Sequence, residues 1–218
     1  MGNRIAAVVF DNDGLLLDTE EAWTRAEIAL FERHGGSFTS EHKRDLIGTS
    51  PTTSAAKLEV MLDMPGGGAA LMDELHDLVM DETLAGVPPR PGALELLDVV
   101  RTAGLPVGVA SNSSRRFVER VLSGAGLLDG QFDVVVTSED VEHPKPAPDL
   151  YLAACAGLGV EPERSAALED SATGVAAARA AGMFVVAVPY FPDLPIDGAS
   201  LVVESLADPR VAEALGLG

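Results

Sequence analysis

The sequence is poor in cysteine and in basic residues, and it has no long hydrophobic run. Its single cysteine, Cys155, excludes an intrachain disulfide. The alanines around Cys155 predict that it is a small apolar core residue in a helix. Only 15 lysines and arginines stand against 34 acidic residues, which gives a formal net charge of −19. Because binding to nucleic acid needs clustered positive charge, we expect no nucleic-acid partner. No apolar stretch reaches the roughly 20 residues that cross a bilayer, so we expect no membrane association.

Signals for export and for several other kinds of site are missing as well. Residues 1–4 carry one basic residue and lead directly into an apolar run, so we expect no targeting segment and a cytoplasmic protein. The histidines have no metal-ligand spacing, and no Gly-x-Ser-x-Gly sequence is present, which argues against zinc and serine-hydrolase chemistry. The glycines at 66–68 follow a helical pattern and lack a following Lys-Ser/Thr, so a turn is favoured over a nucleotide-binding loop.

Short β-branched runs alternate with longer helical patterns over much of the chain. Such alternation is typical of βαβ units and predicts an α/β fold with a parallel sheet. The first run is apolar throughout, as expected for a strand that helices cover on both faces. The predicted strands are Ile5–Phe10, Val107–Ala110, Val134–Thr137, Ala166–Leu168 and Val185–Val188.

A helical segment interrupts this alternation after the first strand. Three stretches have apolar residues at helical spacing, and glycine-containing turns separate them. The chain leaves the α/β pattern near Asp18-Thr19 and returns to it in a segment rich in glycine and proline at 86–91. We therefore expect a helical domain at residues 20–85, inserted into an α/β core of residues 1–19 and 86–218. The apolar positions are Trp23, Ala26 and Leu30, then Ala55, Leu58 and Leu62, and finally Leu71, Leu75 and Leu78.

Two aspartates stand at the end of the first strand, in the run Asp11-Asn12-Asp13-Gly14. Aspartate and asparagine often end a strand in a turn, which is the simplest interpretation. However, two like charges at the mouth of an apolar strand repel each other unless a cation or phosphate chemistry uses them. A calcium-binding EF-hand loop does not fit, because Gly14 comes too early and Ala22 stands where a glutamate is needed. Open α/β sheets bind ligands at this end of their strands, so the aspartates are a candidate site.

Three further polar features come at the ends of later segments. Ser111 and Asn112 precede a helix, Lys145 lies between two prolines, and Glu169 and Asp170 end a strand. Each has an ordinary structural explanation, such as a helix cap or an exposed side chain. Together with the aspartates they supply a carboxylate nucleophile, a second carboxylate, an anion-binding hydroxyl, a cation and an acid pair. A shared site at one edge of the sheet explains this set better than coincidence does.

In this order, the motifs resemble those of the haloacid-dehalogenase-like superfamily, specifically its phosphatases and phosphomutases with a helical cap. The four motifs match at Asp11–Gly14, Ser111, Lys145 and Glu169-Asp170. The resemblance covers essentially the whole chain. It implies a Rossmann-like doubly wound parallel sheet as the core, with an inserted all-helical cap domain between the first and second motifs.

The resemblance also implies a mechanism. Asp11 would attack the phosphorus atom and form an aspartyl-phosphate, while Asp13 would protonate the leaving alkoxide and later activate water. Lys145 and Ser111 would neutralise and orient the phosphoryl oxygens, and Asn112 would offer an additional amide donor.

A Mg²⁺ cofactor is part of the same implication. The ion would be held by the Asp11 carboxylate, the Asp13 backbone carbonyl and Asp170, with Glu169 binding directly or through water. Without this cation, the negative charge of Asp11 would repel the phosphate group.

Within the superfamily, the sequence favours a phosphatase of a small phosphorylated metabolite, such as a sugar phosphate or phosphoglycolate. The family's dehalogenases lack an acid at the position of Asp13, because they have no alkoxide to protonate. β-Phosphoglucomutase-like members usually carry a histidine and an arginine at the positions of Trp23 and Pro51, so a phosphomutase is the weaker alternative. A receiver-like signalling module also combines acids, a hydroxyl, lysine and magnesium. The sequence disfavours this alternative, because a receiver has its phosphorylated aspartate on a later strand than its acid pair and has no helical insertion of this size.

Substrate choice is expected to depend on cap residues that face the aspartates, because the core site contacts only the phosphoryl group common to all substrates. Trp23, Arg44 and Ser50 are candidates by position alone. Trp23 fits the core of the cap equally well, and arginines such as Arg44 are more often solvated. Nothing in the sequence indicates the oligomeric state.

Overall fold

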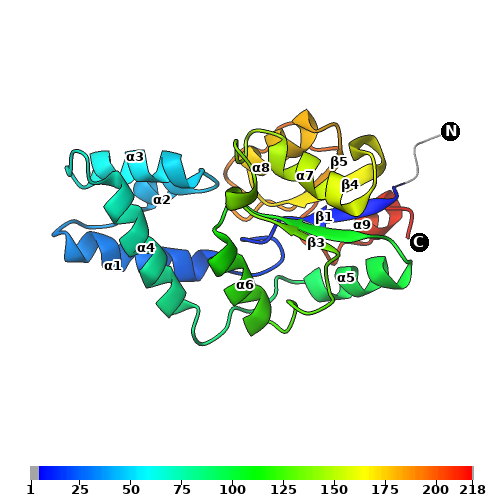
Figure 1. The fold of residues 1–218 in the computed structure, drawn as a ribbon, viewed down its shortest axis with the longest axis horizontal. Coiled ribbons are helices and arrows are strands. Elements are labelled where there is room, and N and C mark those ends of the chain that lie inside the picture. The colour runs from blue at the N-terminus through cyan, green and yellow to red at the C-terminus, as the bar shows by residue number, and fades with distance from the viewer. Residues whose placement is uncertain (1–4, 218) are drawn as a thin grey trace.

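The computed structural model describes residues 5–217, and a six-stranded sheet lies at the centre of its larger lobe (Figure 1). All neighbouring strands are parallel, in the order β3-β2-β1-β4-β5-β6. The chain therefore starts in the middle of the sheet and winds first to one edge and then to the other. Residues 1–4, where we expected no targeting segment, lie outside the described residues. The strands are β1 (Ala7–Phe10), β2 (Val107–Ala110), β3 (Val134–Val136), β4 (Ser165–Glu169), β5 (Phe184–Ala187) and β6 (Leu201–Val202).

Helices cover both faces of the sheet, and the side chains of β1 alternate between them. Val8 and Phe10 belong to the hydrophobic core on one face, while Val9 belongs to the core on the other. All three are fully buried, as expected for a strand with helices on both sides. The helices on the first face are α5 (Ala93–Thr102), α6 (Arg115–Gly124) and α9 (Pro209–Ala214), and those on the second are α7 (Asp149–Leu158) and α8 (Ala172–Ala180).

This architecture confirms the predicted α/β fold with a Rossmann-like, doubly wound parallel sheet. All five predicted strands are present, and their ends differ from the prediction by at most two residues. The sixth strand was not predicted, because β6 has only two residues, one half-buried and one exposed, and shows no alternation. Within the part of the chain that is described, no helix combines the length and apolar character needed to cross a membrane.

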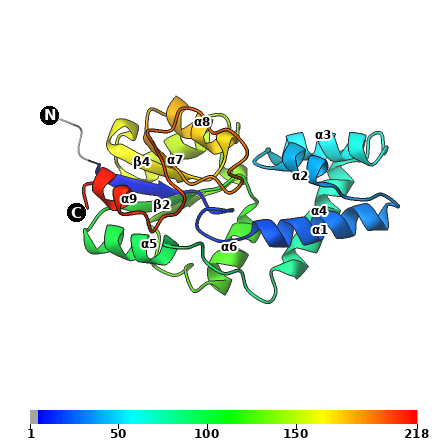
Figure 2. The ribbon, with the colours of Figure 1, turned by 180° about the vertical axis from the view of Figure 1, so that it is seen from behind.

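Four helices between β1 and β2 form a second lobe beside the sheet (Figures 1 and 2). Helix α4 packs against both α1 and α3 through buried leucines. We expected three helices here, and the additional one is α2. Its sequence, SEHKRDL, has a single apolar residue, so it carries no helical hydrophobic period; instead, the Thr39 hydroxyl caps its start. The helices are α1 (Glu20–Arg33), α2 (Ser40–Leu46), α3 (Pro51–Met61) and α4 (Gly68–Glu82).

Two chain crossings connect the lobes, and they lie side by side. The Asp18 backbone N–H donates to the Pro88 carbonyl at 2.9 Å, and the Arg90 N–H donates to the Leu16 carbonyl at 3.0 Å. The Tyr190 hydroxyl donates to the Asp18 carboxylate at 2.8 Å, which ties the outgoing crossing to the loop after β5. Both crossings therefore pass close to the carboxyl end of β1, where the aspartates stand.

Candidate active site

The carboxyl ends of three neighbouring strands bring the candidate residues together. Asp11 directly follows β1, Ser111 follows β2, and Glu169 and Asp170 stand at the end of β4. Because β2, β1 and β4 are adjacent, these ends lie at one edge of the sheet. Lys145 comes from the loop before α7, and its side chain reaches the same edge. The structure thus places all four motifs around one point.

Lys145 is held between two buried acids. Its ammonium donates to Asp11 Oδ1 and to Glu169 Oε1 at 2.6 Å each, and to the Ala110 carbonyl at 2.8 Å. The Tyr151 hydroxyl donates to the same Glu169 oxygen at 2.5 Å, and the Tyr151 ring centre lies 4.9 Å from the ammonium. The side chains of Lys145 and Glu169 are 3% and 0% exposed. Buried charges need partners of opposite sign, and this cluster supplies them.

Burial and close charges shift the pKa values of this cluster. Burial alone would lower the pKa of Lys145, but Asp11 and Glu169 outweigh it and raise that pKa, so the ammonium stays charged. For Asp11, burial together with the Glu169 and Asp13 carboxylates outweighs Lys145 and raises the pKa well above its ordinary value. The pKa of Asp170 is also raised, by burial and then by Asp11 and Glu169. The cluster therefore holds more carboxylates than one ammonium can balance.

This excess of carboxylates fits a divalent cation. Oxygens of Asp11, Glu169 and Asp170 lie within 4.8 Å of one another, and hard cations prefer oxygen ligands. Glu169 is the least available of the three, because one of its oxygens faces Lys145 and the other accepts from the Asp170 amide at 3.2 Å. The Asp170 carboxylate packs against Gly14, where a Cβ would lie 2.3 Å from Oδ2. Gly14 also has a φ of +79°, which glycine adopts without strain.

Three hydroxyls hold the Asp13 carboxylate. Thr19 donates to Oδ1 at 3.0 Å, and Ser111 and Ser113 donate to Oδ2 at 2.9 and 2.8 Å. The Ser111 side chain is fully buried. In this structure the Ser111 hydroxyl therefore positions Asp13, and its contact with a phosphoryl group stays a prediction.

Asn112 holds the loop that carries Lys145. Its side-chain amide donates to the Lys145 carbonyl at 3.1 Å, and its oxygen accepts from the Lys145 backbone N–H at 2.9 Å. Because the backbone is fixed on both sides of Cα, the lysine side chain leaves it from a defined position. Asn112 also lines the cavity next to the site.

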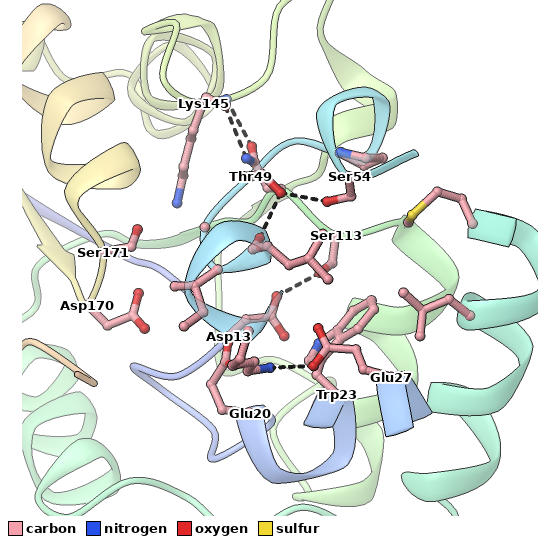
Figure 3. A pocket seen from close by; sticks show the side chains of 18 of the residues that line it. Asp13, Glu20, Trp23, Glu27, Thr49, Ser54, Ser113, Lys145, Asp170 and Ser171 are labelled. Carbon is pink, nitrogen blue, oxygen red and sulfur yellow. Dashed lines mark hydrogen bonds and ion pairs between the residues drawn. The ribbon is translucent and has the colours of Figure 1, made fainter. Parts of the chain in front are cut away.

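A cavity of about 120 Å³ lies between the carboxyl ends of the strands and the helical lobe. Figure 3 shows Asp13 surrounded by Asp170, Glu20, Trp23 and Glu27, all of which line the cavity. Trp23 thus lines the cavity, and its ring also packs against a phenylalanine of α6, with 5.2 Å between ring centres. Residues from both lobes therefore surround the space in front of the aspartates.

Two of the candidate residues in the helical lobe do not line the cavity. The Ser50 hydroxyl caps α3 by accepting from the Thr53 N–H at 3.3 Å, and Arg44 is exposed. The neighbours of Ser50 contact the cavity in its place. The hydroxyls of Thr49 and Ser54 share a hydrogen bond of 2.6 Å, and both residues are part of the cavity wall. The side chain of Ser50 is used at a helix start, and its contact with a substrate stays a prediction.

Residues 8–188 match the family model described as "Haloacid dehalogenase-like hydrolase", a span that runs from β1 past β5. The chain belongs to this family. Hexitol phosphatase B of Escherichia coli O157:H7 is 32% identical over an alignment of 228 residues that covers 98% of each protein. Fructose-1-phosphate phosphatase YqaB of Escherichia coli (strain K12) is 35% identical over 191 residues, which cover 86% of this chain and 98% of YqaB.

Solved structures of the family agree with this assignment. The crystal structure of CbbY from Rhodobacter sphaeroides in complex with phosphate aligns with a TM-score of 0.83 at 30% identity, covering 94% of this chain and 96% of CbbY. A CbbY variant in complex with xylulose-(1,5)bisphosphate aligns with the same TM-score at 29% identity. The haloacid dehalogenase-like hydrolase fold of this chain thus includes the helical lobe as well as the sheet.

The site of this haloacid dehalogenase-like hydrolase contains residues that the sequence did not single out. Three of them line the cavity from the helical lobe, namely Glu20, Glu27 and Lys43. The fourth is Tyr151, whose hydroxyl donates to the Glu169 carboxylate. A signal for the two acids was present, because Glu20, Trp23 and Glu27 are spaced by three and four residues and so share one face of α1. No such signal was present for the other two residues. Lys43 lies in α2, which has no helical hydrophobic period, and the sequence around Tyr151 is typical of an ordinary core position in a helix.

Proposed function

We propose that the chain is a Mg²⁺-dependent phosphatase that hydrolyses a small phosphomonoester through an aspartyl-phosphate on Asp11. The observation that carries this proposal is the buried pairing of Asp11 with Lys145 at 2.6 Å, beside Asp13 and Asp170 in one small cavity. A carboxylate nucleophile, a fixed positive charge and a second acid are the parts that phosphoryl transfer needs. The phosphatase names of two relatives support the reaction class.

Two carboxylates divide the chemistry of this proposal. In the first step, an Asp11 oxygen bonds to phosphorus while the bond between phosphorus and the substrate oxygen breaks, and Asp13 gives its proton to that oxygen. In the second step, Asp13 takes a proton from water while the water oxygen bonds to phosphorus and the bond to Asp11 breaks. The products are the free alcohol and inorganic phosphate, and both carboxyl groups return to their starting states.

Other side chains position these two acids and the phosphoryl group. The Lys145 ammonium neutralises a phosphoryl oxygen next to Asp11, and Asn112 fixes the backbone from which Lys145 extends. Ser111 and Ser113 hold Asp13 by its Oδ2, which keeps this carboxyl group at the edge of the cavity. Donors that are fixed before the reaction stabilise charge without reorganising during it.

The metal ion fits between the carboxylates. Asp11 and Asp170 would hold Mg²⁺, with the Asp13 backbone carbonyl and Glu169, directly or through water, completing the protein ligands. When bound, the ion supplies the positive charge that lets an anionic nucleophile approach an anionic phosphate. The Asp11, Glu169 and Asp170 oxygens within 4.8 Å of one another support this assignment.

We assign residues 20–85 to a cap domain and residues 1–19 and 86–218 to the catalytic core. The helices α1–α4 join the sheet lobe through the two adjacent crossings, and they form the second wall of the cavity. In this assignment the core transfers the phosphoryl group, and the cap contacts the rest of the substrate.

The test is turnover of para-nitrophenyl phosphate by the purified chain, with Mg²⁺ and after its removal by a chelator. We expect phosphate release that requires Mg²⁺ and falls by at least about a thousandfold in Asp11→Asn. Asp129→Asn is the matched control, because Asp129 is exposed in the loop after α6, and it should retain full turnover. Undiminished turnover by folded Asp11→Asn protein would overturn the proposal. Conversion of β-glucose 1-phosphate to glucose 6-phosphate without net hydrolysis would support the phosphomutase instead.

A further inference from the structure

The cap side of the cavity carries a buried ion cluster that the proposed mechanism does not use. The Lys43 ammonium lies 2.9 Å from Glu20 Oε2 and 2.9 Å from Glu27 Oε2. The side chains of Glu20, Lys43 and Glu27 are 14%, 11% and 6% exposed, and all three residues line the cavity. Figure 3 shows both glutamates near Trp23 and Asp13, and all four residues line the same cavity. If the phosphoryl group binds at Asp11 and Asp13, as proposed, this cluster forms part of the wall around the leaving group.

This cluster leaves no positive charge free on the described part of the cap wall. With both glutamates ionised it has one net negative charge, and with Glu27 protonated it is neutral. The other ionisable cap residue in the wall is His76, and burial lowers its pKa, so it is uncharged at neutral pH. A second phosphate or a carboxylate on the substrate would meet Glu20 and Glu27 without a counter-charge.

The same wall suits a neutral group that is rich in hydroxyls. Carboxylate oxygens of Glu20 and Glu27 can accept hydrogen bonds from substrate hydroxyls, and the hydroxyls of Thr49 and Ser54 can both donate and accept them. The Trp23 ring supplies a flat apolar surface for the C–H face of a sugar. The cavity volume of about 120 Å³ suits a small leaving group.

On the basis of the proposed phosphatase activity, we propose that Glu20, Lys43 and Glu27 select the substrate by charge. They accept phosphomonoesters of neutral polyhydroxylated alcohols, namely sugars and sugar alcohols, and they reject substrates with a second phosphate or a carboxylate. Lys43 keeps the two glutamates at the cavity wall and is saturated by them, so it does not attract an anionic substrate. The core contacts only the transferred phosphoryl group, and the discrimination therefore arises in the cap.

The test compares kcat/KM for fructose 1-phosphate and fructose 6-phosphate with kcat/KM for fructose 1,6-bisphosphate, and includes phosphoglycolate as the carboxylate substrate. We expect kcat/KM for the better monophosphate to exceed that for the bisphosphate by about a hundredfold, because the second phosphate would lie beside the Glu20 and Glu27 carboxylates. In Glu27→Gln and Glu20→Gln, which keep the side-chain shape and remove one charge, this preference should fall about tenfold. Glu21→Gln is the matched control on the same helix, since the Glu21 side chain is 77% exposed, and it should leave the preference unchanged.

Two results would overturn the inference. One is a kcat/KM for the bisphosphate or phosphoglycolate that equals or exceeds that for the monophosphates. The other is an unchanged preference in both variants when circular dichroism shows that they are folded. Failure of the underlying function looks different, because the wild-type chain would then not hydrolyse para-nitrophenyl phosphate either. Failure of this inference alone leaves that hydrolysis and its dependence on Asp11 intact.

Discussion

An ammonium held between two carboxylates occurs twice around the cavity, once on each side. The core cluster also contains Asp170, so its negative charge exceeds that of the lysine and a divalent cation fits there. The cap cluster has no third carboxylate, so its excess is one negative charge when both glutamates are ionised. The first arrangement is therefore suited to holding a metal ion and a phosphate, and the second to selecting by charge. The clusters are Asp11, Lys145 and Glu169 in the core, and Glu20, Lys43 and Glu27 in the cap.

Glu27 should make the stability of the protein depend on pH. Burial, with a contribution from Glu20 and against the effect of Lys43, raises its pKa from 4.5 to about 7. Because the folded state then binds this proton more tightly than the unfolded state, the stability it contributes is complete below about pH 4.5 and is lost as the pH rises to about 7. The full shift corresponds to on the order of 3 kcal/mol. Burial would lower the pKa of Lys43, but Glu20 and Glu27 raise it, so Lys43 stays charged in this range.

Urea unfolding of the wild type and of Glu27→Gln at several pH values measures this loss. The free energy of unfolding of the wild type, relative to that of the variant, should decrease through the range from about 4.5 to about 7 and level off above it. Glu21→Gln should show no such trend relative to the wild type, because its side chain is exposed. A difference that stays constant or increases with pH would contradict the raised pKa.

Side chains at the ends of predicted strands could be recognised from the sequence, because their place in the fold follows from that of the strand. Asp11 and Asp170 are examples. The partner of the Ser111 hydroxyl could not be predicted, because it depends on the distance between the ends of β1 and β2, and Asp13 is 98 residues away in the chain. Tyr151 was missed for a similar reason, since its hydroxyl meets a carboxylate only once α7 is packed on the sheet.

At the level of elements, the first turn of α8 is packed so closely on Glu169 that position 174 has no room for a side chain. A Cβ on Gly174 would lie 1.9 Å from Glu169 Oε1 and 2.0 Å from its Cδ. Glu169 is fully buried and holds Lys145, so it is not free to move aside. The Gly174 N–H also donates to the Ser171 hydroxyl that caps the helix, at 3.1 Å. The glycine therefore lets α8 begin directly beside the acids.

Gly174→Ala should lower both stability and activity. We expect the free energy of unfolding to fall by about 1–3 kcal/mol through overpacking, and turnover to fall because Glu169 and Lys145 are displaced. Gly124→Ala is the matched control, because a Cβ there would be 3.9 Å from the nearest neighbouring atom. Alanine is the better helix former, so this variant should gain up to about 1 kcal/mol and keep its activity. Equal stability and turnover of the two variants, measured by urea unfolding and phosphate release, would contradict the packing around Glu169.

The elements themselves could be predicted where burial imposes a pattern. β1 is apolar because helices cover both of its faces, and α1, α3 and α4 have apolar stripes because they pack on one another. α2 and β6 lack such a pattern. The residues of α2 are almost all polar, and the helix begins at the side-chain cap of Thr39. Strand β6 adds only two residues to the edge of the sheet. Their formation depends on the surrounding structure more than on their own sequences.

For the molecule as a whole, the formal charge of −19 should make stability depend on salt. Repulsion among carboxylates opposes the compact state, and salt screens it. Raising NaCl from about 10 to about 150 mM, which shortens the Debye length from roughly 30 to 8 Å, should therefore raise the Tm. Choline chloride at the same ionic strength is the control, because its cation coordinates carboxylates weakly, and it should give a similar increase. A Tm that decreases in both salts would contradict this account.

The central claim, that Asp11 is the nucleophile and Asp13 its acid and base, is tested most directly with Asp13→Asn and para-nitrophenyl phosphate. Nitrophenolate leaves without a proton, so this variant should still transfer the phosphoryl group to Asp11, but it lacks the base that activates water. We predict a burst of about one nitrophenolate per chain followed by near arrest, with the phosphoryl group found on Asp11 by mass spectrometry. Sustained turnover without a burst, or a phosphoryl group on another residue, would contradict the account.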